Sequence, residues 1–218
     1  MVMIAEWMMM FDREQLRMVL ALFVVAVIAA VLLGLTNMAT RKPIAMAQKQ
    51  TLQRALQQVL PEHNNDPQAQ VIDVDGFAIY PAREHGVLAG LAWQVIAPDG
   101  YSGAIRILVG VHPDGRILAI RVIYNKETPG LGDGIVHNKA WVNSFRGRGL
   151  EGVRWKVKKD GGDFDQFTGA TISPRAVVKA VKGALIFYRD KRAVIMRRLS
   201  GKLSRKVKAP PPRNQSVM

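Results

Sequence analysis

Residues 86–124, GVLAGLAWQVIAPDGYSGAIRILVGVHPDGRILAIRVIY, decide the fold of the globular part of this chain. They hold three β-rich runs, separated by the turn sequences PDG (98–100) and HPDG (112–115). Tight Asp-Gly turns between consecutive strands are typical of antiparallel pairing. Another β-rich run, VIDVDGFAIY (71–80), comes before them, and GVRWKV (152–157) is a candidate for a further strand. The pattern predicts an antiparallel meander.

Helical patterns stand on both sides of these runs. Residues 48–60, QKQTLQRALQQVL, have apolar residues at helical spacing, and Pro61 ends the pattern. Ser173-Pro174 predicts a second helix with Ser173 as its N-cap, and an apolar stripe from Val177 to Tyr188 follows. We therefore expect an α+β domain in which helices flank the sheet.

The composition excludes several kinds of redox and metal chemistry. The 218 residues include no cysteine, so disulfides, thiolate zinc sites and cysteine-ligated iron–sulfur clusters are excluded. The four histidines lie far apart in sequence, which argues against a histidine-rich metal site. We expect no metal site and no catalytic residue, and any redox chemistry requires an organic cofactor.

One apolar run has the length of a membrane span. Residues 18–35, MVLALFVVAVIAAVLLGL, carry no charge and would extend about 27 Å as a helix, close to the thickness of the hydrocarbon core. A cleaved signal peptide is the alternative, but no Ala-x-Ala site follows, so we favour an uncleaved anchor. We expect an N-terminal cytoplasmic segment (1–17), a transmembrane helix (18–38), a folded domain (43–190) and a basic, disordered tail (191–218).

The tail carries most of the net charge of +14. Residues 189–218 hold ten Lys or Arg and a single acid, Asp190. No Trp or Tyr follows Tyr188 to stack on bases, so we expect no nucleic acid as partner. An anionic lipid surface, an acidic partner subunit and a merely solvated tail all remain open.

Residues 163–174, DFDQFTGATISP, form the segment with the clearest features of a ligand-binding site. The small residues Gly169 and Ala170 leave the Thr171 hydroxyl accessible, and the helix start that follows presents free backbone N–H groups to a phosphate. These features by themselves fit either a phosphate site or an ordinary capped helix.

The same segment resembles the flavinylation motif D-x-x-[ST]-G-A-[TS] of the G subunit of Rnf-type electron-transport complexes, a relative of the C subunit of the sodium-pumping NADH:quinone reductase. In that family a flavin transferase joins FMN through its phosphate to the final hydroxyl. The resemblance makes Thr171 the acceptor, and the other matching positions are Asp165, Thr168, Gly169 and Ala170.

A second segment, NKETPGLGD (125–133), is similar to the family's K-E-T-P-G-L-G loop beside the flavin. The resemblance assigns Glu127, Thr128 and Leu131 to the FMN site. The Pro-Gly-Leu-Gly sequence fits a turn whose backbone closely approaches a flat ring. We assign none of the aromatic residues Trp93, Trp141, Trp155 and Phe167 to the site.

The resemblance implies a flavoprotein subunit of an inner-membrane complex that couples electron transfer between ferredoxin and NAD to movement of Na⁺ or H⁺. Its FMN domain would lie on the periplasmic side, and its partners would be the other subunits, the membrane and a flavin transferase. The flanking charges argue for the opposite orientation, because Arg13 and Arg17 precede the span and four basic residues follow it, although this rule weakens for long translocated domains. A membrane-anchored scaffold that binds lipid or a noncovalent phosphate ligand is the alternative function.

Overall fold

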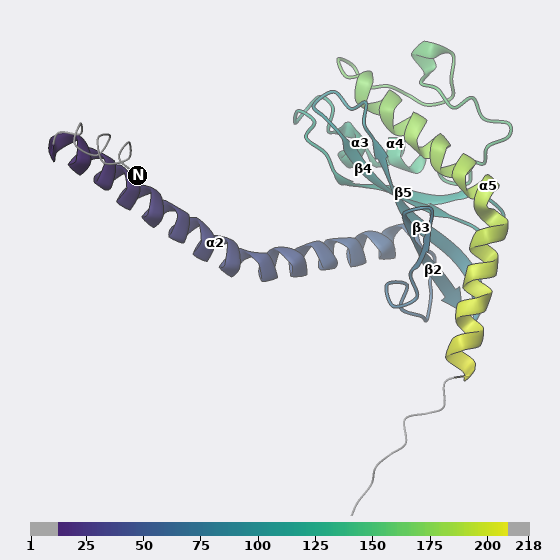
Figure 1. The fold of residues 1–218 in the computed structure, drawn as a ribbon. Coiled ribbons are helices and arrows are strands. Elements are labelled where there is room, and N and C mark those ends of the chain that lie inside the picture. The colour runs from purple at the N-terminus through teal and green to yellow at the C-terminus, as the bar shows by residue number, and fades with distance from the viewer. Residues whose placement is uncertain (1–12, 209–218) are drawn as a thin grey trace, which may run out of the picture. The chain divides into compact units, whose positions relative to one another are not determined.

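The computed structural model describes residues 13–208, and it describes their side chains except at positions 42, 45, 48 and 202–208 (Figure 1). The chain divides into two compact units, with the boundary between Gln50 and Thr51. The long helix α2 (Arg13–Val59) contributes to both of them, with Pro43 inside it. The helices expected at 18–38 and 48–60 are therefore parts of one continuous element. Residues 1–12 of the expected N-terminal segment lie outside the described residues.

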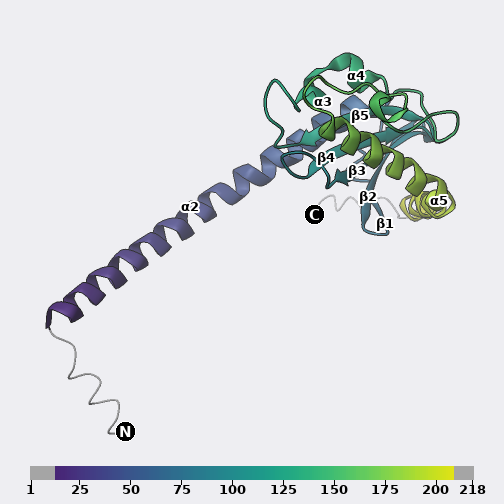
Figure 2. The same cartoon turned by 90° about the horizontal axis from the view of Figure 1, so that it is seen from above.

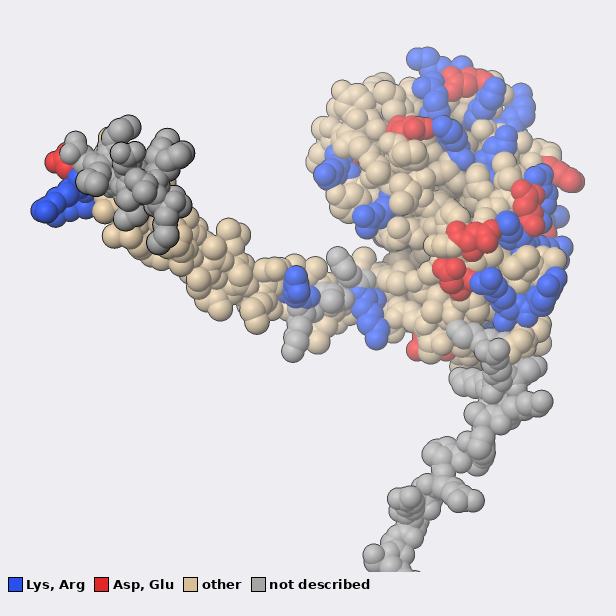
Figure 3. Space-filling model, viewed as in Figure 1, with Lys and Arg blue, Asp and Glu red and all other residues tan. Residues whose placement is uncertain are grey.

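The first unit contains a helix with the properties of a membrane span. Residues Arg13–Arg41 of α2 are long and apolar enough to cross a bilayer, and no residue in their most apolar window is buried within the protein. Figure 3 shows an uninterrupted stretch of uncharged side chains along the middle of this helix. Because so many exposed Leu, Val and Ile side chains are unfavourable in water, a lipid surrounding suits this segment.

The second unit is built on a five-stranded antiparallel sheet, which confirms the predicted meander. The strands follow the chain order and are β1 (Ile72–Val74), β2 (Phe77–Glu84), β3 (Val87–Ala97), β4 (Ile105–Val111) and β5 (Ile117–Tyr124). The run 71–80, which reads as one strand, is two strands joined at Asp75-Gly76. Both residues of this turn have positive φ, as do His85 and Gly86 between β2 and β3. Positive φ at both turn positions is characteristic of tight hairpins.

Helices cover both faces of the sheet (Figure 2). Helix α5 (Ile172–Lys208) buries its apolar stripe, including Val177, Val181 and Leu185, against one face. The last turns of α2 pack on the other face through Leu56 and Val59. A Cβ on Gly110 would overlap the carbonyl oxygen of Val59, so this helix end requires a glycine in β4. The domain is α+β, as predicted.

Short helical turns connect β5 to α5. They are α3 (Gly134–His137), α4 (Lys139–Asn143) and the 3₁₀ turn η1 (Lys158–Asp160). The prediction of a strand at 152–157 is wrong, because this segment forms only an isolated bridge between Val157 and Phe164. Its aromatic residue Trp155 instead packs against Phe145 and Phe164 in the core.

The prediction of disorder after residue 190 is also wrong for the part that the structure describes. Helix α5 continues to Lys208, and its Ile195 and Leu199 are buried in the main core. Lys191 pairs with Asp75 at 2.7 Å, and Arg198 donates to the Asp73 carbonyl. Figure 3 shows basic and acidic side chains mixed on the side of the domain where α5 runs. Residues 209–218 of the expected tail lie outside the described residues.

Candidate functional site

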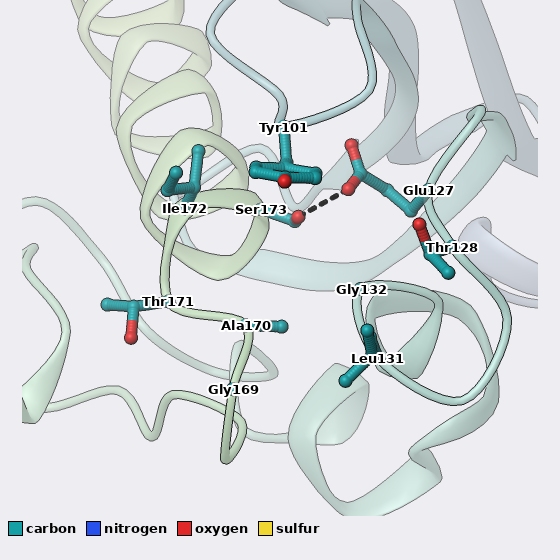
Figure 4. Close-up of a pocket in the computed structure, with 10 residues that line it drawn as sticks. All are labelled: Tyr101, Glu127, Thr128, Leu131, Gly132, Gly169, Ala170, Thr171, Ile172 and Ser173. Atoms are coloured by element: carbon teal, nitrogen blue, oxygen red, sulfur yellow. Dashed lines mark hydrogen bonds between the residues drawn. The ribbon is translucent and has the colours of Figure 1, made fainter.

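A cavity of about 160 Å³ lies between the loop after β5 and the start of α5 (Figure 4). Six of the predicted site residues line it, and they come from both sequence motifs. Four further residues complete the lining. The ten are Tyr101, Glu127, Thr128, Leu131, Gly132, Gly169, Ala170, Thr171, Ile172 and Ser173.

The loop after β5 is a tight turn stabilised by its own backbone. The Thr128 carbonyl accepts hydrogen bonds from the N–H groups of Leu131 (3.1 Å) and Gly132 (3.2 Å). Gly130 has a φ of 78°, which L side chains rarely adopt, and its N–H donates to Oδ1 of Asp133 at 2.9 Å. This turn places Leu131 at the cavity with half of its surface exposed.

The start of α5 forms the opposite wall. The helix begins at Ile172, so Thr171 directly precedes it, and the Thr171 carbonyl accepts from the N–H of Arg175 at 3.2 Å. Ser173 lies inside the first turn of the helix, so the prediction that it is the N-cap is wrong. Its hydroxyl instead donates a hydrogen bond to Glu127, a residue 46 positions away in the sequence.

This contact between Ser173 and Glu127 joins the two motifs. The distance from Oγ of Ser173 to Oε2 of Glu127 is 2.6 Å, and the residues are 1% and 6% exposed. The other carboxylate oxygen, Oε1, accepts from the backbone N–H of Ser102 at 3.3 Å. A Cβ on Gly132 would lie 2.6 Å from Oε2 of Glu127, so only glycine leaves room for this arrangement.

Three large side chains with apolar surface surround the cavity and remain exposed. Tyr101 is 70% exposed, Leu131 50% and Ile172 44%. Exposed apolar surface around a cavity suits a flat, largely apolar ligand, while Glu127 and Thr128 offer polar contacts at its edge. The sequence motifs did not identify Tyr101 or Ile172. Ile172 directly follows the predicted flavinylation motif in the sequence. Tyr101 lies on the loop between β3 and β4.

The remaining predicted residues lie beside the cavity. Asp165 is exposed and pairs with Lys158 at 2.6 Å, and its carbonyl accepts from Nε1 of Trp141 at 2.8 Å. Thr168 is exposed and does not line the cavity. The partly exposed Thr171 side chain points away from Glu127, toward the outer side of the loop (Figure 4). The Thr171 side chain is therefore partly accessible from outside the domain.

The four aromatic side chains near these segments belong mainly to the core. Trp93, Trp141 and Trp155 are buried. The Phe167 ring is partly buried and packs on Trp141, with 5.3 Å between ring centroids. A Cβ on Gly134 would approach the same Phe167 ring to 2.8 Å, so this contact also depends on a glycine.

Ion pairs hold the segment between η1 and the start of α5. Arg175 contacts Asp160 through two hydrogen bonds of 2.7 and 2.9 Å, and this contact lowers the pKa of the Asp160 carboxyl and raises that of Arg175. The backbone N–H and the guanidinium of Arg154 bind Asp163 and lower its pKa. Among residues 13–208, no group of three or more His, Asp or Glu side chains could hold a metal ion.

Comparisons with known proteins agree with this geometry. The model of the FMN-binding domain family matches residues 100–186, which include the whole cavity. The chain is therefore a protein with an FMN-binding domain. The model of the RnfG N-terminal region matches residues 8–59.

Similar proteins identify the family. The G subunit of the ion-translocating oxidoreductase complex of Aliivibrio fischeri is 43% identical over 196 residues, covering 83% of this chain and 92% of the relative. That of Pseudomonas aeruginosa is 44% identical over 191 residues, covering 81% and 89%. The chain belongs to the family of G subunits of ion-translocating oxidoreductase complexes. The crystal structure of Shewanella oneidensis NqrC is 24% identical, with a TM-score of 0.43, covering 50% of this chain and 55% of that one.

Proposed function

We propose that this chain is a membrane-anchored electron carrier of an ion-translocating oxidoreductase complex, with FMN joined through its phosphate to Oγ1 of Thr171. When bound, FMN supplies a ring system that accepts and returns electrons. The observation that supports this most strongly is the cavity itself. It brings the loop 127–132 to the acceptor segment 169–173, directly beside an accessible threonine hydroxyl.

The chemistry of attachment determines what Thr171 must do. Its hydroxyl oxygen bonds to phosphorus, and its proton passes to solvent. An ester forms readily only if another bond to that phosphorus breaks, which calls for a flavin dinucleotide donor that releases a nucleoside monophosphate. No oxidation state changes in this step, so it needs no oxidant or reductant. A covalent link then retains the flavin while its redox state, and with it its noncovalent affinity, changes.

The residues around the cavity divide into two groups with different roles. Leu131, Ile172 and Tyr101 would pack against the ring, and Glu127 and Thr128 would contact its polar edge. The exposed segment of Asp165, Thr168, Gly169 and Ala170 would be what the flavin transferase recognises. Gly169 has a φ of 77°, and this conformation turns the chain sharply just before the acceptor.

We place the FMN domain on the periplasmic side of the bacterial inner membrane, with α2 as the single span. The flanking charges oppose this orientation, but they carry little weight for a domain of this length. The uncharged middle of α2 offers no path for an ion by itself. Ion movement would therefore be the task of other subunits of the complex, with this chain supplying the electron carrier.

Covalent flavin is tested on a denaturing gel viewed under ultraviolet light. The full chain, produced with a flavin transferase, should give a fluorescent band, because denaturation removes any noncovalent flavin. Thr171→Ala should abolish the band, and Thr171→Ser should retain part of it since a hydroxyl remains. Thr168→Ala is the comparison variant: it keeps the acceptor hydroxyl but changes the segment that the transferase would recognise, so its band should weaken and still persist. A fluorescent Thr171→Ala chain would refute the assignment.

A further inference from the structure

We propose that Arg175 binds the phosphate of the flavin on Thr171, through the N–H groups that its contact with Asp160 leaves free. This inference rests on Thr171 as the acceptor and adds a residue that neither sequence motif contains. Arg175 would be a positioning residue, since it contacts the phosphate and leaves the redox-active ring to the cavity.

The helix places Arg175 beside the acceptor. Arg175 follows Thr171 by four positions, and its backbone N–H donates to the Thr171 carbonyl at 3.2 Å. Side chains four residues apart lie on the same face of a helix, and helical side chains lean toward the N-terminus. The backbone bond therefore places Arg175 one helical turn after the acceptor, and its long side chain is directed back toward the helix N-terminus where Thr171 lies.

The charge of the first turn is unusual. A cation near a helix N-terminus is unfavourable because the helix dipole is positive there, and acidic residues are the usual choice. The first turn of α5 contains no acidic residue and carries Arg175 instead. A negative group bound at this point would remove the conflict, and a phosphodiester on Thr171 carries one negative charge.

Asp160 fixes the guanidinium from outside the helix. Its carboxylate accepts hydrogen bonds from Nε of Arg175 at 2.7 Å and from Nη2 at 2.9 Å. These two bonds leave the Nη1 hydrogens for a second anion, because a guanidinium has five donors. Lys156 and Lys159 also act on Asp160 electrostatically, so the local charge stays positive although this carboxylate is present.

The two partners have different expected roles, which makes the proposal testable. Arg175→Gln removes both the contact with Asp160 and the contact with phosphate. Asp160→Asn removes the carboxylate charge but leaves the Arg175 guanidinium available. Because both residues are partly exposed, with side-chain exposures of 48% and 33%, neither change should unfold the domain, and thermal melting of the flavin-free chains checks this.

The experiment measures covalent flavin on the purified full chain against time by intact mass, with a flavin transferase and a flavin dinucleotide. Arg175→Gln should slow attachment about tenfold, as loss of a hydrogen bond to a charged group predicts, and Arg175→Lys should recover part of the rate. Asp160→Asn should stay within about twofold of the wild-type rate, since one exposed carboxylate contributes little.

A second measurement separates a phosphate contact from a contact with the transferase. After complete attachment, the ³¹P resonance of the product should shift in Arg175→Gln and keep its wild-type position in Asp160→Asn. Equal slowing of both variants would show that the ion pair acts only by holding the loop, and an unchanged ³¹P resonance in Arg175→Gln would exclude the contact. Either result overturns the proposal while Thr171 remains the acceptor. A wild-type chain without flavin on Thr171 would instead refute the proposed function itself.

Discussion

Gly132→Ala tests whether the contact between Glu127 and Ser173 organises the cavity. The new methyl group would lie 2.6 Å from Oε2 of Glu127, 3.0 Å from Cβ of Glu127 and 3.0 Å from Oγ of Ser173. The carboxylate must then move, and its 2.6 Å hydrogen bond with Ser173 breaks. Loss of a hydrogen bond to a buried charged group costs about 1.5–3 kcal/mol. For a domain of this size, this lowers Tm by roughly 3–12 °C.

The assay is thermal unfolding of the flavin-free chain in detergent, followed by near-ultraviolet circular dichroism. Gly183→Ala is the control, because Gly183 lies in α5 with nothing within 4 Å of the position that a new methyl group would take, and it should gain roughly 1–4 °C from helix propensity. The two glycine-to-alanine changes should therefore have opposite signs. A Tm for Gly132→Ala equal to the wild type would refute the link between the two motifs.

Three further predictions concern the core, acid stability and topology. Ile195→Ala should destabilise the domain by about 2–5 kcal/mol in chemical denaturation, because Ile195 is fully buried, whereas Arg197→Ala should have little effect; equal, small effects would mean that α5 does not pack beyond residue 190. The pKa of Asp163 is lowered from its ordinary value of 3.8, so its contribution to stability is present above about pH 4 and is lost as the pH falls below it. Melting of Asp163→Asn from pH 7 to 3 should show a smaller acid loss than the wild type, and parallel curves would contradict this. A reporter enzyme that is active only in the periplasm should be active when fused to the C-terminus; activity of a cytoplasmic reporter at this position would reverse the proposed orientation.

Local signals in the sequence were sufficient for the sheet. The turns at 98–100 and 112–115 and the β-rich runs between them specify neighbouring antiparallel strands, because each strand pairs with the next along the chain. The boundary at Asp75-Gly76 was also readable as a hairpin turn. The segment 152–157 was misassigned because buried aromatic and apolar residues, such as Trp155, occur in irregular core segments as well as in strands.

The end of α5 shows how composition can mislead. Ten basic residues favoured a solvated tail, yet Ile195 and Leu199 continue the apolar stripe of Tyr188 at spacings of seven and four. A search for periodicity inside the basic segment would have found this stripe. The burial of these two side chains stabilises the helix although its exposed face is strongly basic.

The site was predictable only where motifs mark it. Motif residues from Glu127 and from Thr171 do line one cavity, but their contact across 46 residues depends on tertiary folding. Tyr101 also reaches the cavity only through tertiary folding, because it lies on a separate loop. The hydroxyl of Ser173 looked like a cap because local sequence suits that role, and a buried carboxylate from another element takes its hydrogen bond instead.

The most direct test of the central claim is peptide mapping of the full chain produced with a flavin transferase. Trypsin cleavage after Lys159 and Arg175 releases residues 160–175, which contain both Thr168 and Thr171. Fragmentation between Gly169 and Ala170 and between Ile172 and Ser173 then assigns the added mass to Thr168, Thr171 or Ser173. We predict one FMN phosphoester on Thr171 and an unmodified Thr168; FMN on Thr168 or Ser173, or an unmodified peptide, would contradict the account.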